Sequence, residues 1–97
     1  MISTKEAYKQ KIEAEVELAQ AKLAELKAQA KSSAADASIK YAKQIEELEQ
    51  GVDTTKAKLK ELDNAGEDTW ERVKGGVEST WGKLSAAVRD TAAKFKH

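Results

Sequence analysis

The chain has 97 residues, of which 40% are hydrophobic and 35% are charged, and its 17 basic and 17 acidic side chains give a formal net charge of zero. The absence of cysteine excludes disulfides, thiolate metal sites and thiol nucleophiles, and the absence of a basic excess argues against nucleic-acid binding. This composition, which also lacks proline, is typical of long helices and coiled coils, and we expect a single domain over residues 1–97.

The first residues predict the start of a helix. Ser3 and Glu6 form the capping-box pattern S-x-x-E, in which each side chain accepts a hydrogen bond from a backbone N–H of the other residue. The segment MISTKEAYKQ lacks the apolar centre of a secretory signal peptide, and no apolar run reaches the roughly 18 residues of a membrane span. We therefore expect a soluble cytoplasmic protein.

An apolar line then follows the chain for most of its length. Its members recur every three or four residues, with a mean spacing of about 3.6, which is the period of one face of an α-helix. They are Tyr8, Ile12, Val16, Ala19, Leu23, Leu26, Ala30, Ser33, Ala37, Tyr41, Ile45, Leu48, Val52, Thr55, Leu59 and Leu62. Because this line keeps its phase, the sequence predicts one long helix over residues 4–63.

Two places along this helix allow a different interpretation. Ser32 and Ser33, followed by Asp36, could form a second capping box, and a break there would give three helices and a spectrin-like monomeric bundle. Gly51 could introduce a kink. We favour continuity because the flanking segments AKLAELKAQAK and AADASIKYAK are strong helix formers without glycine or proline.

The clearest stop signal is the segment Asp63-Asn64-Ala65-Gly66, since Asn and Gly tolerate the left-handed conformation that ends many helices. It predicts a turn over residues 64–66 and a second, antiparallel helix over residues 67–96. Gly75 and Gly76 each cost about 1 kcal/mol relative to Ala inside a helix, which suggests a hinge or a close backbone contact. The apolar face of this helix consists of Trp70, Val73, Val77, Trp81, Leu84, Val88, Ala92 and Phe95.

The unequal lengths of the two helices predict an oligomer. Folded back, the second helix covers about residues 34–62 and leaves the apolar face from Tyr8 to Ala30 in water, which is a large exposed patch for a monomer. An antiparallel homodimer is the simplest way to cover it and gives four helices in cross-section, a bundle or coiled coil. We therefore assign the apolar residues of both helices to an oligomer and packing face, and predict that Leu23→Asp or Leu26→Asp dissociates the oligomer.

Reactive groups are sparse and dispersed. The only histidine is the terminal residue His97, so a Ser/His/Asp arrangement has no rigid base, and the chain carries neither a phosphate loop nor zinc-ligand spacing. Two carboxylate clusters stand on helices without an oxygen-rich loop, and helical spacing splays such side chains apart, so we expect solvated faces: Glu13, Glu15 and Glu17, and Glu46, Glu47 and Glu49. We expect no enzyme activity, no cofactor and no bound metal; an all-helical enzyme or metal store is the low-ranked alternative.

The second helix supports a different functional hypothesis. Trp70, Trp81 and Phe95 on one face, with basic residues elsewhere, could place residues 67–97 in a membrane interface. Six basic and five acidic residues give this segment a net charge of +1, which attracts anionic lipid only weakly. Peripheral binding to lipid or another apolar surface is thus the alternative to a structural or interaction protein.

Three stretches carry a resemblance to known proteins: STKEAYKQKIEAEV at the start, IKYAKQIEEL in the centre, and GEDTWERVKGGVESTWGKLSAAV near the end. With these, nearly the whole chain resembles a family of small bacterial coiled-coil-domain proteins associated with stress responses. The resemblance implies a bacterial, cytoplasmic, helical protein linked to stress, and supplies no catalytic residues. The Ala/Lys/Glu alternation is also loosely similar to late-embryogenesis-abundant and apolipoprotein-like repeats. We expect a self-associating structural or interaction protein with an unidentified partner.

Overall fold

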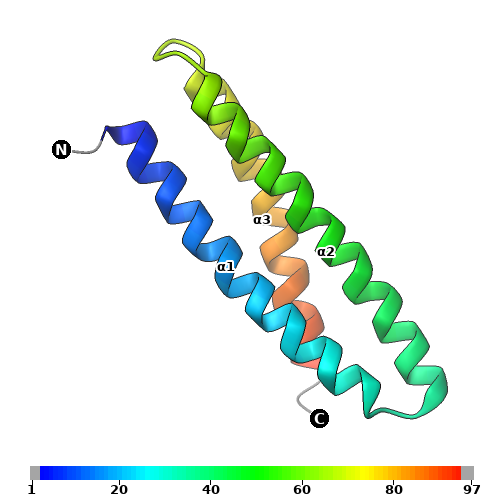
Figure 1. The fold of residues 1–97 in the computed structure, drawn as a ribbon. Helices are drawn as coiled ribbons and strands as arrows, with labels where there is room; N and C mark the ends of the chain where they lie inside the picture. The colour runs from blue at the N-terminus through cyan, green and yellow to red at the C-terminus, as the bar shows by residue number, and fades with distance from the viewer. Residues whose placement is uncertain (1–2, 95–97) are drawn as a thin grey trace.

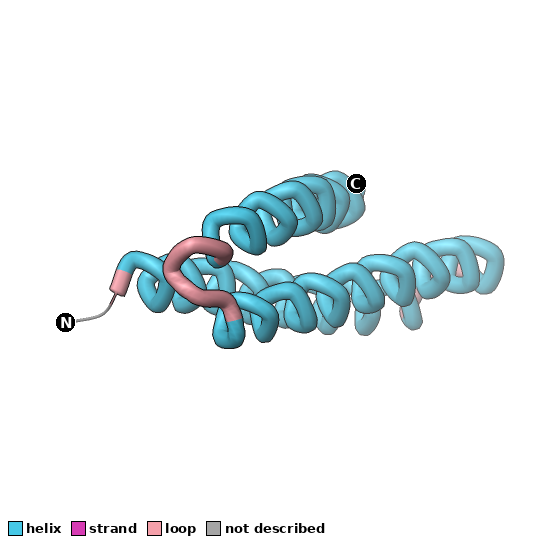
Figure 2. The backbone as a smooth tube through the Cα atoms, turned by 90° about the horizontal axis from the view of Figure 1, so that it is seen from above, coloured by secondary structure: helices cyan, strands magenta, loops and turns pink. Residues whose placement is uncertain are grey.

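The computed structural model describes residues 3–94 and contains three α-helices: α1 (Thr4–Lys31), α2 (Ala35–Asn64) and α3 (Trp70–Lys94). The all-helical fold class predicted from the sequence is confirmed. α2 runs antiparallel to α1, and α3 returns parallel to α1 behind the seam between the other two helices (Figure 1). From above, α1 and α2 form one layer and α3 a second (Figure 2). The bundle is elongated, with extents of 51 × 21 × 16 Å.

α1 begins where the capping pattern predicts. The Ser3 backbone is extended, with φ −70° and ψ 164°, and its hydroxyl accepts a hydrogen bond from the backbone N–H of Glu6 at 3.2 Å. The carbonyl of Ser3 also accepts from the N–H of Ala7 at 2.9 Å. The first bond satisfies an N–H group that has no partner in the first turn, and the second is the first regular hydrogen bond of the helix.

The single long helix predicted over residues 4–63 is wrong, because the chain turns at residues 32–34 and forms two helices. The hydroxyls of Ser32 and Ser33 both donate to the carbonyl of Gln29, at 2.9 and 3.3 Å, which satisfies an acceptor at the end of α1. The alternative of a break near Ser32–Ser33 was correct, but its capping box is absent: Ala34, not Ser33, is the N-cap of α2, and it makes no side-chain cap hydrogen bond.

The turn is favoured by what it buries. With α1 folded back on α2, the apolar face from Ile12 to Ala30 is covered by the same chain, and Leu26 is only 1% exposed. Closing a three-residue turn costs little loop entropy compared with burying a helix-long apolar face. The patch that predicted a homodimer is therefore absent from the monomer.

The second turn lies close to its predicted position. α2 ends at Asn64, and its C-cap Ala65 is extended; no residue between 3 and 94 has a positive φ, so the predicted left-handed ending does not occur. The carbonyl of Gly66 accepts from the backbone N–H groups of Thr69 and Trp70, at 3.1 and 3.0 Å. This tight turn delays the start of α3 to Trp70, three residues after the predicted start at residue 67.

The glycines flagged in the sequence do not break the helices. Gly51 lies inside α2, where a Cβ would come within 2.7 Å of Leu84 Cδ1, so its lack of a side chain makes room for α3. Gly75 and Gly76 lie inside α3, and a Cβ on either would meet nothing within 4 Å. Close packing thus explains Gly51 only.

Candidate functional site

The predicted packing face forms the interior of one bundle. Its described members are buried or partly buried, whereas Phe95 lies outside the described residues. The buried members are Ile12, Val16, Leu23, Leu26, Ala30, Ile45, Val52, Leu59, Leu62, Val77, Trp81, Leu84 and Val88. The partly buried members packed against them are Tyr8, Ala19, Tyr41, Leu48, Trp70, Val73 and Ala92.

One polar contact crosses from α3 to α1 at the middle of the bundle. The indole Nε1–H of Trp81 donates to Oε1 of Glu15 at 2.9 Å. Trp81 is 6% exposed, so its N–H needs a partner that water cannot supply freely. Glu15 therefore has a structural role at the edge of the core.

An aromatic cluster joins the beginnings of α1 and α3. The rings of Tyr8 and Trp70 lie with their centroids 6.4 Å apart, and Lys74 Nζ lies 5.2 Å from the Tyr8 centroid and 5.8 Å from the Trp70 centroid. These distances fit a cation–π arrangement. Burial, and then the carboxylates of Glu78 and Glu15, raise the pKa of Tyr8 to about 12. The enclosed Tyr8 hydroxyl has no hydrogen-bond partner within the described residues.

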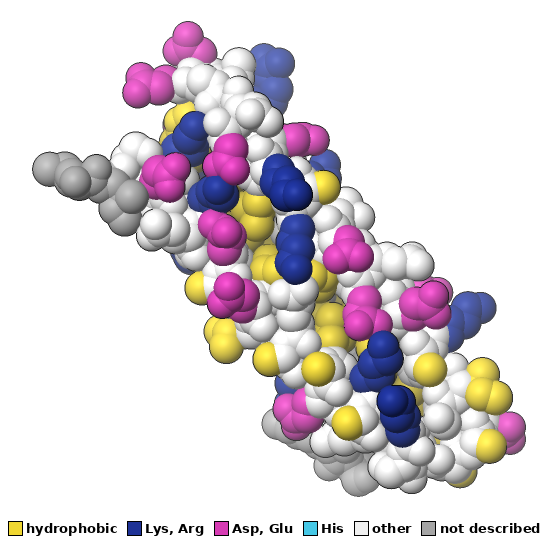
Figure 3. Space-filling view, viewed as in Figure 1, with side chains coloured by type: hydrophobic (Ala, Val, Ile, Leu, Met, Phe, Trp, Pro, Cys, Tyr) yellow, Lys and Arg dark blue, Asp and Glu magenta, His cyan; other side chains and the backbone are white. Residues whose placement is uncertain are grey.

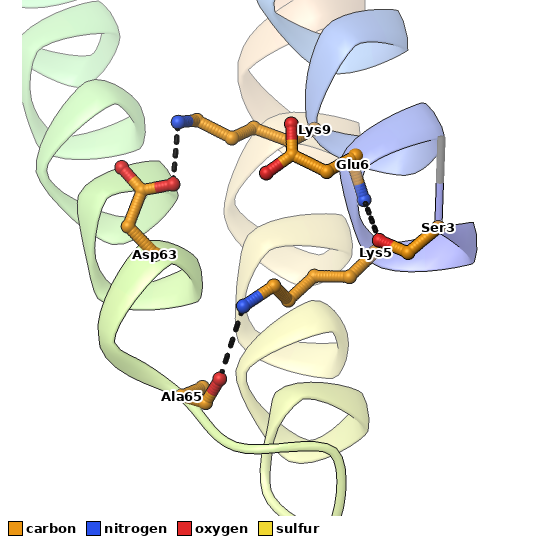
Figure 4. Close-up of polar contacts among 6 residues, drawn as sticks. All are labelled: Ser3, Lys5, Glu6, Lys9, Asp63 and Ala65. Carbon is orange, nitrogen blue, oxygen red and sulfur yellow. Dashed lines mark hydrogen bonds and ion pairs between the residues drawn. The ribbon is translucent and has the colours of Figure 1, made fainter. Parts of the chain in front are cut away.

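Polar contacts also join the start of α1 to the end of α2 (Figure 4). Lys5 Nζ donates to the carbonyl of Ala65 at 3.1 Å, and the ammonium of Lys9 pairs with the carboxylate of Asp63. The hydrogen bond to Asp63 raises the pKa of Lys9. Nearer the first turn, Lys27 pairs with Glu49 at 3.7 Å, so both interhelical ion pairs described join α1 to α2.

The face opposite α3 carries an open groove between α1 and α2. In Figure 3 hydrophobic atoms show between rows of charged side chains along this seam. Basic and acidic groups alternate around the groove without a concentration of either sign. Its lining consists of Lys9, Glu13, Val16, Glu17, Gln20, Lys56, Leu59, Lys60 and Asp63.

The carboxylate clusters expected to be solvated are separated by the helix geometry. Glu13 and Glu17 line the groove beside α2, whereas Glu15 points to Trp81 on α3. Among residues 3–94, no three carboxylate, histidine or cysteine groups gather closely enough to hold a metal ion. His97 lies outside the described residues.

Sequence reasoning missed the roles of two polar residues at the edge of this interior. Lys74 follows Trp70 by four residues, the spacing at which side chains meet on a helix. Its contact with the Trp70 ring could therefore have been predicted from the sequence. Glu15 had only a weak signal, its place beside Val16 at the edge of the apolar line, because its partner Trp81 is 66 residues away.

No family model, no curated protein and no solved structure matches this chain. Within residues 3–94, no helix combines the length and apolar character that crossing a membrane requires.

Proposed function

We propose that the chain is a non-enzymatic helical protein that acts through its apolar helix faces, by self-association and by contact with a protein partner. One observation supports this proposal: large apolar side chains from all three helices converge on one continuous interior, with Leu18 and Ile39 as exposed exceptions. The polar contacts, by contrast, are single pairs at its edge, such as Trp81 with Glu15 and Lys9 with Asp63. These faces are buried in the monomer, so they bind another chain only when a helix moves away from the bundle.

A role in a bacterial stress response is part of the proposal and rests on the resemblance of the three sequence stretches alone. A location in the cytoplasm is what that resemblance implies, and it is proposed on the same basis. An elongated bundle suits a component that associates with copies of itself, because the apolar faces of its interior are of the kind that packs between chains in helical assemblies.

Absolute mass by size-exclusion chromatography with light scattering, over a hundredfold dilution series, tests self-association. We expect a dimer at high concentration that dissociates on dilution toward the 10.6 kDa monomer. A mass of one chain at every concentration, up to the millimolar range, would contradict it.

A second candidate function is binding of α3 to a lipid or other apolar surface. It is favoured by the way in which α3 is held in the bundle, mainly by apolar contacts. The described interhelical ion pairs join α1 to α2, and Gly75, Gly76 and Gly82 weaken the α3 helix without a packing role within the chain. A helix held mainly by apolar contacts can transfer its apolar face to another surface at a low energetic cost.

Co-sedimentation with vesicles of phosphatidylglycerol and phosphatidylcholine tests this second function. Trp81 is already 6% exposed in the bundle, so a blue shift of its emission would not distinguish lipid from protein interior. Quenching of Trp fluorescence by brominated acyl chains does distinguish them, because bromine quenches only over short distances. We expect quenching and co-sedimentation to appear together; protein that stays in the supernatant would dispose of this function.

A further inference from the structure

The apolar line of the sequence runs through the first turn without losing its phase. Ala30, Ser33, Ala37 and Tyr41 continue the spacing of three or four residues across residues 32–34, where the helix is interrupted. Ala30 and Ile45, on either side of the turn, are 2% and 1% exposed and belong to the same core. Two helices joined by a turn do not need a common phase, so this continuity indicates that a straight helix is encoded as well.

The turn itself contains nothing that prevents a helix. Residues 32–34 are Ser-Ser-Ala, and no described residue has a positive φ. At Ser32 the backbone, with φ −93° and ψ 2°, is near the helical region, whereas Ala34 has a helical φ of −58° and a ψ of 150°. Rotation of this ψ toward the helical value of about −42° is a main part of straightening the chain.

The closed turn also satisfies its backbone incompletely. Ala34 caps α2 without a side-chain hydrogen bond, although alanine is among the poorest N-cap residues. A continuous helix would pair the first N–H groups of α2 with the last carbonyls of α1, which otherwise lack helical partners. The hydroxyls of Ser32 and Ser33 do not oppose this change, because bonds to a carbonyl three or four residues earlier also fit a continuous helix, as those of Thr54 and Thr55 do inside α2.

We propose that residues 32–34 are a hinge, and that two copies of the chain exchange α1 by opening it into one straight helix over residues 4–64. In the exchanged dimer, the α1 of one copy occupies the place on α2 and α3 that the other copy's α1 has left. The occupant is a second copy because only this chain supplies every contact unchanged, including Trp81 with Glu15 and Lys9 with Asp63.

Small side chains suit the point where the two straight helices would cross. The twofold axis would pass near the hinge, where Ala30, Ser33 and Ala37 lie on the apolar line and allow the two backbones to come close. Lys27 in α1 pairs with Glu49 in α2 near the hinge. In the exchanged dimer this ion pair would form between the two copies, once on each side of the crossing.

This inference rests on the self-association proposed above, and it can fail while self-association holds. The natural chain has no cysteine, so two introduced cysteines are the only thiols that a crosslinker can join. The variant Lys9→Cys/Asp63→Cys places two thiols where the structure joins α1 to α2. A short bismaleimide crosslinker then links positions 9 and 63 within one chain in the closed form, and between two chains in the exchanged dimer.

The experiment applies this crosslinker to the dimer fraction from size exclusion, followed by denaturing electrophoresis. We expect a covalent band of two chains, whereas Lys9→Cys alone gives none, because the two α1 starts lie at opposite ends of the exchanged dimer. A dimer fraction that yields only single-chain product would overturn the exchange and leave self-association intact. Absence of any dimer, in the natural chain and in the hinge variants below, would overturn both.

Variants of the hinge residues provide an independent test, because they should change the dimer dissociation constant in opposite directions. Ser32→Ala/Ser33→Ala raises helix propensity at both hinge positions in each of the two chains, so we expect the dimer dissociation constant to fall about tenfold or more. Insertion of four Gly/Ser residues after Ser33 should abolish the dimer, since a long flexible loop favours the closed hairpin. Ser79→Ala, at an exposed site on α3, is the matched control and should leave the equilibrium unchanged. Equal dimerisation by the alanine and insertion variants would contradict the hinge.

Discussion

The indole N–H of Trp81 donates to the carboxylate of Glu15 at 2.9 Å and joins the centre of α3 to α1 across 66 residues of sequence. α3 packs more extensively on α2 than on α1, so this bond lies at the less extensive interface of the bundle. It fixes the rotation of α3 about its own axis, because only one orientation brings both the indole ring into the core and its N–H to Glu15.

Removal of the Glu15 acceptor should destabilise the bundle. In Glu15→Ala the Trp81 N–H loses its partner at a nearly buried site, so we expect a loss of about 1–3 kcal/mol in the free energy of unfolding. Glu15→Gln keeps a carbonyl acceptor and should lose less than half as much. Urea denaturation followed by circular dichroism measures both. The exposed Glu17→Ala serves as the control, and an equal loss there would assign the effect to charge rather than to the hydrogen bond.

Alanine substitutions at glycines should separate a packing role from a weakened helix. Gly75→Ala meets open space and should stabilise the protein by about 0.5–1 kcal/mol through helix propensity. Gly51→Ala gains the same propensity, but its Cβ would lie 2.7 Å from Leu84 Cδ1, so the end of the Leu84 side chain must shift, and this shift offsets part of the gain. Thermal unfolding should therefore rank Gly75→Ala above both the natural chain and Gly51→Ala. The reverse order would contradict the close approach of α3 at Gly51.

An aspartate at Leu26 should unfold the monomer rather than dissociate an oligomer, in contrast to the expectation from the sequence. Leu26 is 1% exposed within a single chain, and a buried unpaired charge costs several kcal/mol. Leu18→Asp is the control on the same helix, since Leu18 is 73% exposed and the charge stays in water. Circular dichroism should show lost helix for the first variant only. A folded Leu26→Asp monomer would refute the intramolecular packing of α1.

The ionisation of Tyr8 should be displaced to high pH. Its pKa of about 12 lies above the unfolded value of about 10, so the folded state holds the proton more tightly. The resulting stabilisation is complete below pH 10 and is lost as the pH rises from 10 to 12. In a Tyr41→Phe background, tyrosinate absorbance near 295 nm should titrate with a midpoint near 12 while the helix signal persists. A midpoint near 10 in folded protein would show that the hydroxyl is solvated.

Replacement of Tyr8 by phenylalanine should cost little, because its hydroxyl has no partner among the described residues. Tyr8→Phe keeps the ring against Trp70 and Lys74, so we expect a change within about 0.5 kcal/mol in urea unfolding at pH 7, and no loss of stability between pH 10 and 12 from this site. A loss above 2 kcal/mol would mean that the hydroxyl makes a bond in solution, for example to Glu15 or Glu78.

Local patterns in the sequence determined much of this protein. The Ser3 cap and the residues of the apolar interior follow from residue type and spacing, because each depends on neighbours within one or two turns. The same signals indicate where α2 ends, but not the extended conformation with which it ends. The helical period identified Val16 and Val77 as core residues without any knowledge of what covers them. The same reasoning identified Gly51 as unusual, but not its reason.

Only the tertiary structure decided whether the chain turns at residues 32–34. Ala and Lys on both sides favour a helix, and the serines permit either form, so local propensity alone favours a continuous helix. The choice depends on what buries the face from Ile12 to Ala30, which is a contact with residues far along the chain. The Trp81–Glu15 bond and the Gly51–Leu84 approach are undetermined for the same reason. Burial between distant segments depends on how the whole chain folds, so it cannot be predicted from the spacing of residues along one helix.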